Sequence, residues 1–199
     1  MYQKYIKRIL DIIFSAILFP FVVLIVCFFG ILIVIDDGFP IFYNAERRGK
    51  NGRVFSMYKL RSMKKNSPDI RKKDGSTYNS ENDPRLTKIG KFIRKYSIDE
   101  IPQIFNVLIG NMSFVGPRPG LVSKKYADLE EKKKKRLEVM PGITGYSQAY
   151  YRNSISQEEK IDKDCWYVEN VSFLLDAKIV IKTFVGVISH ANIYNTKDN

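Results

Sequence analysis

The sequence contains 199 residues, enough for one ordinary domain. Its 33 Lys and Arg residues outnumber its 21 Asp and Glu residues, for a formal net charge of +12, and 45% of its residues are hydrophobic. This composition excludes a disordered basic tail and favours an anionic partner: nucleic acid, a membrane surface or a phosphorylated substrate.

The first predicted element is a membrane segment at residues 12–35, where no side chain is charged. A bilayer core needs about 20 apolar helical residues, so this run is long enough to enter or cross a membrane. It exceeds the roughly 7–15 apolar residues of a cleaved signal peptide, and residues 34–38 make a poor cleavage site. A buried core helix is the alternative interpretation.

Basic residues flank this segment on both sides, at positions 4, 7 and 8 before it and 47, 48 and 50 after it. Because basic flanks stay on the cytoplasmic side, a helix that enters the membrane and returns keeps both flanks in the cytoplasm. Pro20 favours this re-entrant form, since proline kinks a helix; a kinked single span is the alternative. The predicted division is a re-entrant membrane helix at 1–37 and a cytoplasmic, membrane-associated domain at 38–199.

The second domain is predicted to be mainly α with a small β-hairpin (α+β). The hairpin covers residues 40–60, where strand-like stretches flank an Asn51-Gly52 turn signal, and the polar residues 64–84 predict a loop. Helices are predicted over 86–96, 101–107, 130–138 and 173–188, the last as a core helix or an interfacial helix. The lysines at 132–135 are typical of a solvated face, with docking to anionic headgroups as the alternative.

Several common chemistries are excluded by what the sequence lacks. The single histidine, His190, lies near the C-terminus, and neither a P-loop nor a dinucleotide-binding glycine motif occurs. Cys27 lies in the apolar run and Cys165 lies beside Trp166, so we expect no disulfide scaffold. Any chemistry must therefore use carboxylates, basic groups or a metal.

The adjacent carboxylates Asp99 and Glu100 are the first candidate site. One purely structural interpretation is a capping box in which Glu100 reaches back to Ser97, but Pro102 would then lie inside the helix. In either arrangement the pair lies at a helix N-terminus, which favours an ionised carboxylate and attracts phosphate. An ionised Asp near a phosphoryl group can act as a nucleophile, and Mg²⁺ suits one or two carboxylates plus substrate phosphates.

Two further segments are candidates for substrate contact. Pro117 and Pro119 make a rigid loop around Arg118, a residue type suited to bidentate phosphate binding; a structural ion pair is the alternative. A Gly-rich turn at 141–145 precedes Gln148 and Arg152, and on its own it predicts only a loop.

Taken together and in order, these segments resemble the bacterial sugar transferases, the small monotopic polyprenyl-phosphate phosphoglycosyl transferases. Besides Arg94, the matching blocks are KRILD at 7–11, ERRGKNG at 46–52, YKLRSM at 58–63, DPRLT at 83–87, SIDEIPQ at 97–103, NVL at 106–108, FVGPRP at 114–119, PGITG at 141–145 and WYVEN at 166–170. The resemblance covers nearly the whole chain, and several blocks are highly specific in combination.

The resemblance implies Mg²⁺-dependent transfer of a sugar 1-phosphate from a nucleotide sugar, usually a UDP-sugar, to undecaprenyl phosphate. The products would be undecaprenyl-diphosphate-sugar and UMP, formed at the cytoplasmic face of the bacterial inner membrane through a covalent phosphosugar-aspartyl intermediate. Such a reaction is the first membrane step in assembling a surface glycan: a capsule, exopolysaccharide, O-antigen or glycoprotein. A re-entrant membrane helix and a mainly helical catalytic domain are implied as well.

On the matching positions, the resemblance assigns catalysis and metal binding to Asp99 and Glu100. The implied phosphate-binding residues are Arg94 and Arg118. Further substrate-binding candidates are Lys59, Arg61, Arg85, Gln148 and Arg152.

Some positions depart from the family pattern. The family usually has Ser-Pro about one helical turn beyond Pro20, and here Phe19 precedes the proline. Tyr146 stands where Trp is common, and Tyr150 and Tyr151 lie where Asn-Gly is usual, which is consistent with a different sugar.

A membrane-tethered basic adaptor that binds anionic lipid or nucleic acid is the competing hypothesis. No nucleic-acid-binding motif accompanies the charge, so nucleic acid is not an expected partner, whereas anionic membrane lipid is. The oligomeric state stays open, with a homodimer among the options.

Overall fold

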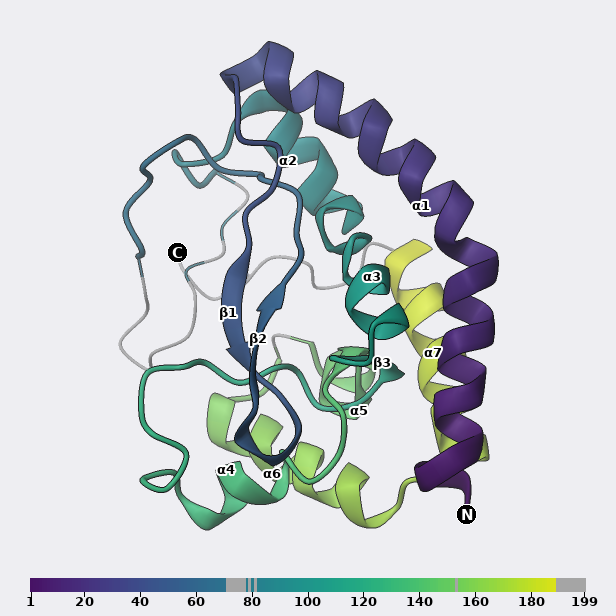
Figure 1. Cartoon of the computed structure of the whole chain (residues 1–199). Coiled ribbons are helices and arrows are strands. Elements are labelled where there is room, and N and C mark those ends of the chain that lie inside the picture. The colour runs from purple at the N-terminus through teal and green to yellow at the C-terminus, as the bar shows by residue number, and fades with distance from the viewer. Residues whose placement is uncertain (71–77, 79, 81, 153, 189–199) are drawn as a thin grey trace.

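The computed structural model describes residues 1–70, 78, 80, 82–152 and 154–188, which form a mostly helical molecule with two small sheets (Figure 1). The middle of the predicted 64–84 loop, Asn153 and residues 189–199, which include His190, lie outside the described residues. The helices and helical turns are η1 (Tyr2–Ile6), α1 (Lys7–Asp37), η2 (Lys50–Gly52), α2 (Lys88–Lys95), η3 (Ile98–Glu100), α3 (Gln103–Leu108), α4 (Glu131–Lys135), α5 (Tyr146–Tyr150), α6 (Gln157–Glu169) and α7 (Phe173–Ile188). The strands are β1 (Ala45–Arg48), β2 (Val54–Met57), β3 (Ser113–Val115) and β4 (Gly142–Thr144).

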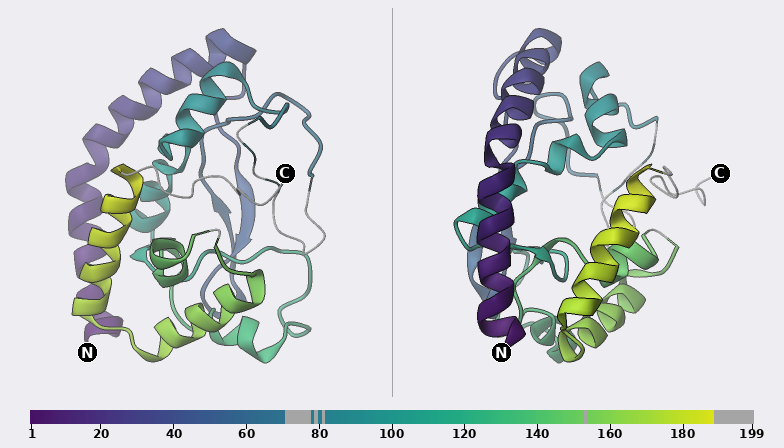
Figure 2. Two further views of the ribbon diagram at one scale, coloured as in Figure 1. Left: turned by 180° about the vertical axis from the view of Figure 1, so that it is seen from behind. Right: turned by 90° about the vertical axis from the view of Figure 1, so that its right-hand side faces the viewer.

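The apolar segment forms one long helix, α1, which curves along one side of the molecule (Figures 1 and 2). Pro20 lies inside α1 and does not end it. A single face of the helix is buried, through Asp11, Ser15, Val22, Gly30 and Ile33, while large apolar side chains cover the rest of its surface. With η1, it is the one helix of the described residues that is long and apolar enough to cross a membrane, so it is a candidate for membrane insertion.

The predicted hairpin is confirmed, with shorter strands than expected. Strand β1 pairs antiparallel with β2, and Arg48 lies opposite Val54. The connecting turn places Asn51 and Gly52 at φ of 54° and 80°, the conformation that an Asn-Gly pair adopts readily. The stretch 40–43, expected to be part of the first strand, contributes only one bridge, between Phe42 and Leu60.

A second sheet, which the sequence did not predict, joins β3 and β4 in parallel, with Ser113 opposite Gly142. Each strand has three residues, too few for an alternating pattern to be recognised. The backbones approach so closely here that a Cβ on Gly142 would lie 2.1 Å from the amide nitrogen of Gly116. Glycine is therefore required at this crossing.

The four helices predicted in the second domain are all present, with shifted ends for three of them. Helix α2 begins after Thr87, whose hydroxyl accepts a hydrogen bond of 2.8 Å from the Gly90 amide. Helix α3 begins at Gln103 because Pro102 takes its N-cap position, and α7 has the predicted bounds. Helices α5 and α6 were not predicted.

The lysine run in α4 is matched by acidic partners. Lys132 pairs with Asp162 at 2.6 Å, Lys133 with Glu130 at 2.8 Å and Lys134 with Glu131 at 2.9 Å, and Lys135 pairs with Glu169. This arrangement agrees with a solvated face, because the local charge is largely neutralised.

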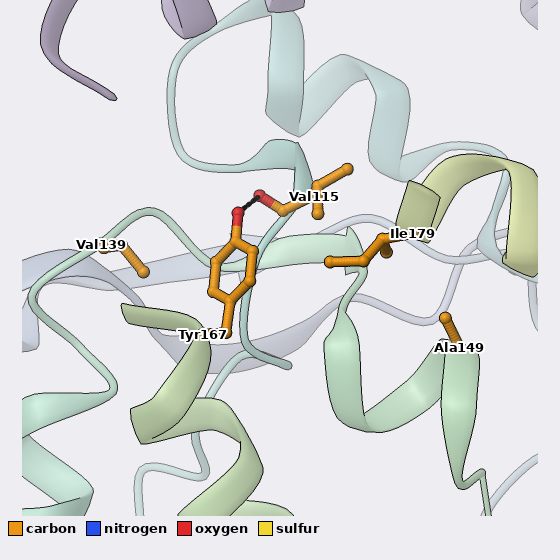
Figure 3. Close-up of a cluster of buried hydrophobic side chains, with 5 residues drawn as sticks. All are labelled: Val115, Val139, Ala149, Tyr167 and Ile179. Carbon is orange, nitrogen blue, oxygen red and sulfur yellow. Dashed lines mark hydrogen bonds between the residues drawn. The ribbon is translucent and has the colours of Figure 1, made fainter. Parts of the chain in front are cut away.

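One of the buried clusters packs α5, α6 and α7 against β3, with Val115, Val139, Ala149, Tyr167 and Ile179 as its buried members (Figure 3). The Tyr167 ring is 1% exposed, and its hydroxyl lies 3.3 Å from the Val115 carbonyl oxygen. The strand that leads to Arg118 is thereby supported by the C-terminal helices.

Candidate active site

Asp99 and Glu100 lie in the tight helical turn η3, directly before α3. Ser97 precedes the turn in the left-handed conformation, with φ of 56°. The capping box considered for Ser97 and Glu100 is wrong, because the Ser97 side chain makes no capping hydrogen bond and Glu100 points to basic partners instead. The expected position of the pair at a helix N-terminus is confirmed.

Three basic side chains from separate elements gather around this pair. The Lys59 ammonium, just after β2, lies 2.8 Å from Asp99 Oδ2 and 3.3 Å from Glu100 Oε1. The Arg118 guanidinium, beyond β3, lies 3.2 Å from Glu100 Oε1. Arg94, on α2, is close enough for its charge to lower the pKa of Asp99. These five residues form the carboxylate cluster: Lys59, Arg94, Asp99, Glu100 and Arg118. Its first and last members are 59 positions apart in the sequence.

The backbone fixes Lys59 and the carboxylates relative to each other. The Leu60 amide donates to the Asp99 carbonyl oxygen at 2.9 Å. On α3, the fully buried Asn106 accepts from the Tyr58 amide at 2.9 Å and donates to the Ser56 carbonyl at 2.8 Å. Asn106 was not among the predicted site residues, and the available signal was a lone amide between Phe105 and Val107 in an apolar segment.

The two carboxyl groups have opposite pKa shifts. Burial raises the pKa of Asp99, which is 2% exposed, and the negative charge of Glu100 adds to that effect, while Lys59 and Arg94 oppose it. Burial acts on Glu100 in the same direction, but Lys59 and Arg118 outweigh it and hold the pKa of Glu100 at about 2. The neighbouring cations therefore favour the ionised form of Glu100, whereas burial favours the protonated form of Asp99.

This arrangement suits a divalent cation. The buried Asp99 Oδ2 lies 2.8 Å from the Lys59 ammonium, but among the described residues no donor is well aligned for a hydrogen bond to it. The described residues contain no cluster of three or more His, Cys, Asp or Glu side chains that could form a complete metal site. Two carboxylates that share their coordination with substrate phosphates are typical of Mg²⁺, so Asp99 and Glu100 fit this ion.

Arg94 offers a donor for an anion. Its Nη1 is buried and has no hydrogen-bond partner among the residues that the structure describes. A buried donor without a partner is costly, and a phosphate oxygen would satisfy it.

Arg61 and Arg85, both predicted to bind substrate, are held by other parts of the fold. Arg61 pairs with Asp37 at the end of α1 and donates from Nε to the Pro40 carbonyl at 2.6 Å. Arg85 pairs with the fully buried Asp83, with Nη2 at 2.6 Å from Oδ2. Both guanidinium groups are buried structural anchors, and no contact in the described part of the chain joins them to the two carboxylates.

Gln148 and Arg152 lie around α5, outside the cluster. Gln148 donates to the Ile143 carbonyl at 3.4 Å, and its Oε1 is buried without a hydrogen-bond partner among the described residues. Arg152 packs against α7, where a Cβ on Gly186 would lie 2.7 Å from its Nη2. Their substrate-binding role stays a prediction.

A family model described as bacterial sugar transferase matches residues 2–190. The uncharacterised sugar transferase EpsL of Bacillus subtilis is 42% identical over 191 residues, which cover 96% of this chain and 91% of that protein. The galactosyl transferase CpsE of Streptococcus agalactiae is 42% identical over 190 residues, covering 92% of this chain and 42% of CpsE. The UDP-glucose:undecaprenyl-phosphate glucose-1-phosphate transferase of Escherichia coli is 35% identical over 197 residues, covering 95% of this chain and 42% of that protein.

The chain thus spans most of EpsL and less than half of each of the two longer relatives. The family match extends from η1 to beyond the end of α7 and includes every member of the carboxylate cluster. This chain belongs to the bacterial sugar transferase family.

Proposed function

We propose that this protein transfers a sugar 1-phosphate from a UDP-sugar to undecaprenyl phosphate, releasing UMP, at the cytoplasmic face of the bacterial inner membrane. The observation that carries the proposal is the buried Asp99 beside Glu100, surrounded by Lys59, Arg94 and Arg118. Relatives in this family are named for transfers of this kind, the E. coli glucose-1-phosphate transferase among them. Carboxylates and cations in one cluster suit a diphosphate substrate.

The proposed reaction has two displacements at one phosphorus atom. A carboxylate oxygen of Asp99 attacks the β-phosphorus, the bond to the bridging oxygen breaks, and the electron pair leaves with UMP. An oxygen of undecaprenyl phosphate then attacks the same phosphorus, and the bond to Asp99 breaks to restore the carboxylate. Both leaving groups are anions, so neither step requires a proton donor.

The basic residues have separate tasks in this scheme. Lys59 opposes the raised pKa of Asp99, which favours its ionised form, and, with Arg118, holds Glu100 in place. Arg94 and Arg118 bind phosphate oxygens and stabilise the charge that develops on the leaving group. Mg²⁺ bound by Asp99 and Glu100 would neutralise part of the diphosphate charge.

The contacts of α1 support a re-entrant membrane helix. At its C-terminal end, Asp36 accepts from the Ile89 amide at 2.8 Å, and Asp37 pairs with Arg61. At its N-terminal end, Arg8 and Asp11 contact α3 and β3. Since both ends are held by one domain, a helix that enters and leaves on the same side of the membrane fits better than a span.

UMP release tests the proposed function directly. The detergent-purified protein is incubated with Mg²⁺, undecaprenyl phosphate and each of a panel of UDP-sugars. We expect release with at least one donor, and EDTA abolishes it. With the donor alone, a covalent intermediate predicts a burst of up to one UMP per protein.

Two variants make this test specific. Asp99→Asn lowers turnover by at least about 1,000-fold, the scale on which other enzymes depend on a covalent nucleophile. The matched control Asp162→Asn removes a carboxylate from an exposed ion pair and leaves turnover within about two-fold. Folded wild-type protein that releases no UMP with any donor refutes the function, and an active Asp99→Asn variant refutes the nucleophile.

A further inference from the structure

The N-terminal end of α1 binds the helix that follows the two carboxylates. Arg8 Nη1 donates to the Val107 carbonyl at 2.6 Å, and Nη2 donates to the Leu108 carbonyl at 2.9 Å. These carbonyls belong to the last turn of α3, where backbone oxygens lack the usual helical partner four residues ahead; the Val107 oxygen also accepts from the Gly110 amide at 3.1 Å. Gly110, with φ of 88°, leaves room for the contact, because a Cβ there would lie 3.2 Å from Arg8 Nη2. Arg8 is therefore the C-terminal cap of α3.

The same end of α1 also binds strand β3. Asp11 Oδ1 accepts from the Phe114 amide at 3.1 Å and from the Ser113 hydroxyl at 3.1 Å. Asp11 is 6% exposed and Ser113 is fully buried, so water does not substitute for these bonds easily. Strand β3 ends at Val115, three residues before Arg118.

Arg8 and Asp11 are three residues apart, so they project from one side of α1. Figure 1 shows α3 and β3 beside this part of the helix. Helix α3 begins three residues after Glu100, and β3 leads to Arg118, whose guanidinium lies 3.2 Å from Glu100. One short stretch of α1 thus holds the two elements that meet in the carboxylate cluster.

We propose that Arg8 and Asp11 are positioning residues that set the separation between the Asp99–Glu100 pair and Arg118. In this proposal α1 is part of the active-site framework as well as a membrane anchor. The inference rests on the proposed transfer reaction for its kinetic test, and it has a structural test that does not need turnover.

The kinetic test compares kcat for three substitutions near the N-terminus, each of which replaces a charged side chain with an apolar one. Arg8→Met and Asp11→Leu lower kcat by about ten-fold or more, because small displacements of reacting groups are costly. The matched control is Lys4→Met, which also removes a positive charge before the apolar run; Lys4 is exposed, and its ammonium lies over the Tyr5 ring. Lys4→Met keeps kcat within about two-fold, and membrane association of all three variants is measured in parallel.

Two further variants separate positioning from loss of fold. Asp11→Asn retains a carbonyl oxygen at Oδ1, the atom that accepts both hydrogen bonds. We therefore expect the kcat of this variant to lie within about three-fold of that of the parent protein. A double-mutant cycle with Arg118→Ala is expected to be non-additive: Asp11→Leu costs about ten-fold in the parent and less than two-fold in the Arg118→Ala background. Additive losses, or parent-like kcat in both Arg8→Met and Asp11→Leu, overturn the proposal.

The structural test measures the distance between α3 and the Arg118 loop by pulsed electron paramagnetic resonance. Nitroxides are placed at Ile109→Cys and Leu121→Cys, both exposed positions, with Cys27 and Cys165 changed to Ser. Arg8→Met and Asp11→Leu broaden or shift the distance distribution, and Lys4→Met does not. If the parent protein releases no UMP, the proposed transfer function fails, but the distance measurement still tests whether Arg8 and Asp11 position the Arg118 loop. An unchanged distance distribution in both Arg8→Met and Asp11→Leu overturns the positioning proposal.

Discussion

At the scale of single residues, Asp99 and Glu100 are chain neighbours with different surroundings. Asp99 is buried and next to one lysine, whereas Glu100 contacts both Lys59 and Arg118. Their pKa values move apart for this reason, as in other pairs of carboxyl groups that divide two tasks between them. In the proposed reaction, Asp99 is the nucleophile and Glu100 is its ionised neighbour.

The raised pKa of Asp99 predicts the acid side of the pH profile. The nucleophile must be ionised, so kcat/KM rises with pH through the pKa of Asp99, which burial raises in the metal-free protein and which bound Mg²⁺ would lower. Glu100→Gln removes the neighbouring negative charge and moves this limb to lower pH. Arg94→Gln removes a positive charge and moves it to higher pH. Profiles measured on residual turnover that shift in the opposite directions contradict the assignment.

The predicted site residues differ in how the fold uses them. Lys59, Arg94 and Arg118 converge on the carboxylates, while Arg61 and Arg85 bind Asp37 and Asp83. All five are basic residues at positions that match the family, and apart from Arg85, whose partner Asp83 lies in the same block, the sequence does not show which acid each one meets. Asp83 is two residues from Arg85 and is its local partner, whereas Asp37 and Arg61 are 24 positions apart and meet only in the folded chain.

At the scale of secondary-structure elements, the same four-residue pattern has two outcomes. Ser97 and Glu100 spell S-x-x-E and form no capping box, whereas Ser156 and Glu159 form a complete one at the start of α6. Pro102 occupies the N-cap position of α3 and basic partners take the Glu100 side chain. In α6, Ile161 stands at the position that corresponds to Pro102, and the Glu159 side chain accepts from the Ser156 amide at 2.8 Å, so the capping box forms.

This difference predicts unequal effects of two similar substitutions. Ser156→Ala removes the hydrogen bond that the Ser156 hydroxyl accepts from the Glu159 amide, at a cost of about 1 kcal/mol. Ser97→Ala, with no side-chain cap to lose, changes the unfolding free energy by less than about 0.5 kcal/mol. Thermal melts of the detergent-solubilised variants compare them, and equal losses in melting temperature argue against the capping explanation.

At the scale of the whole molecule, α1 is attached along its length and at both ends. Asp36 and Asp37 hold its C-terminal end to α2 and to the segment after β2, and Arg8 and Asp11 hold its N-terminal end. Aromatic contacts add to these, with Phe19 against Phe105 and the Phe29 ring stacked on Phe92. Helix α1 and the rest of the helical domain therefore form one packed unit.

Both ends of α1 are consequently expected on one side of the membrane. Single cysteines at Gln3→Cys and Tyr43→Cys, in a protein with Cys27 and Cys165 changed to Ser, are labelled with a membrane-impermeant maleimide. Inverted vesicles expose the cytoplasmic face and allow labelling of both sites, while intact spheroplasts allow neither. Labelling of Gln3→Cys from the periplasmic side would rule out the re-entrant helix.

The sequence by itself determined the apolar helix, the hairpin turn, the long C-terminal helix and the Asp99–Glu100 pair at a helix start. Each depends on local features: a run without charge, an Asn-Gly pair, a helical period or a proline near a carboxylate pair. Only the tertiary structure decided which cations surround the carboxylates, and it also revealed the pairing of β3 with β4 and the attachment of α1 to α3 and β3. Those contacts join residues far apart in the chain, such as Asp11 with Phe114. Their partners are selected by packing and burial, which no local pattern specifies.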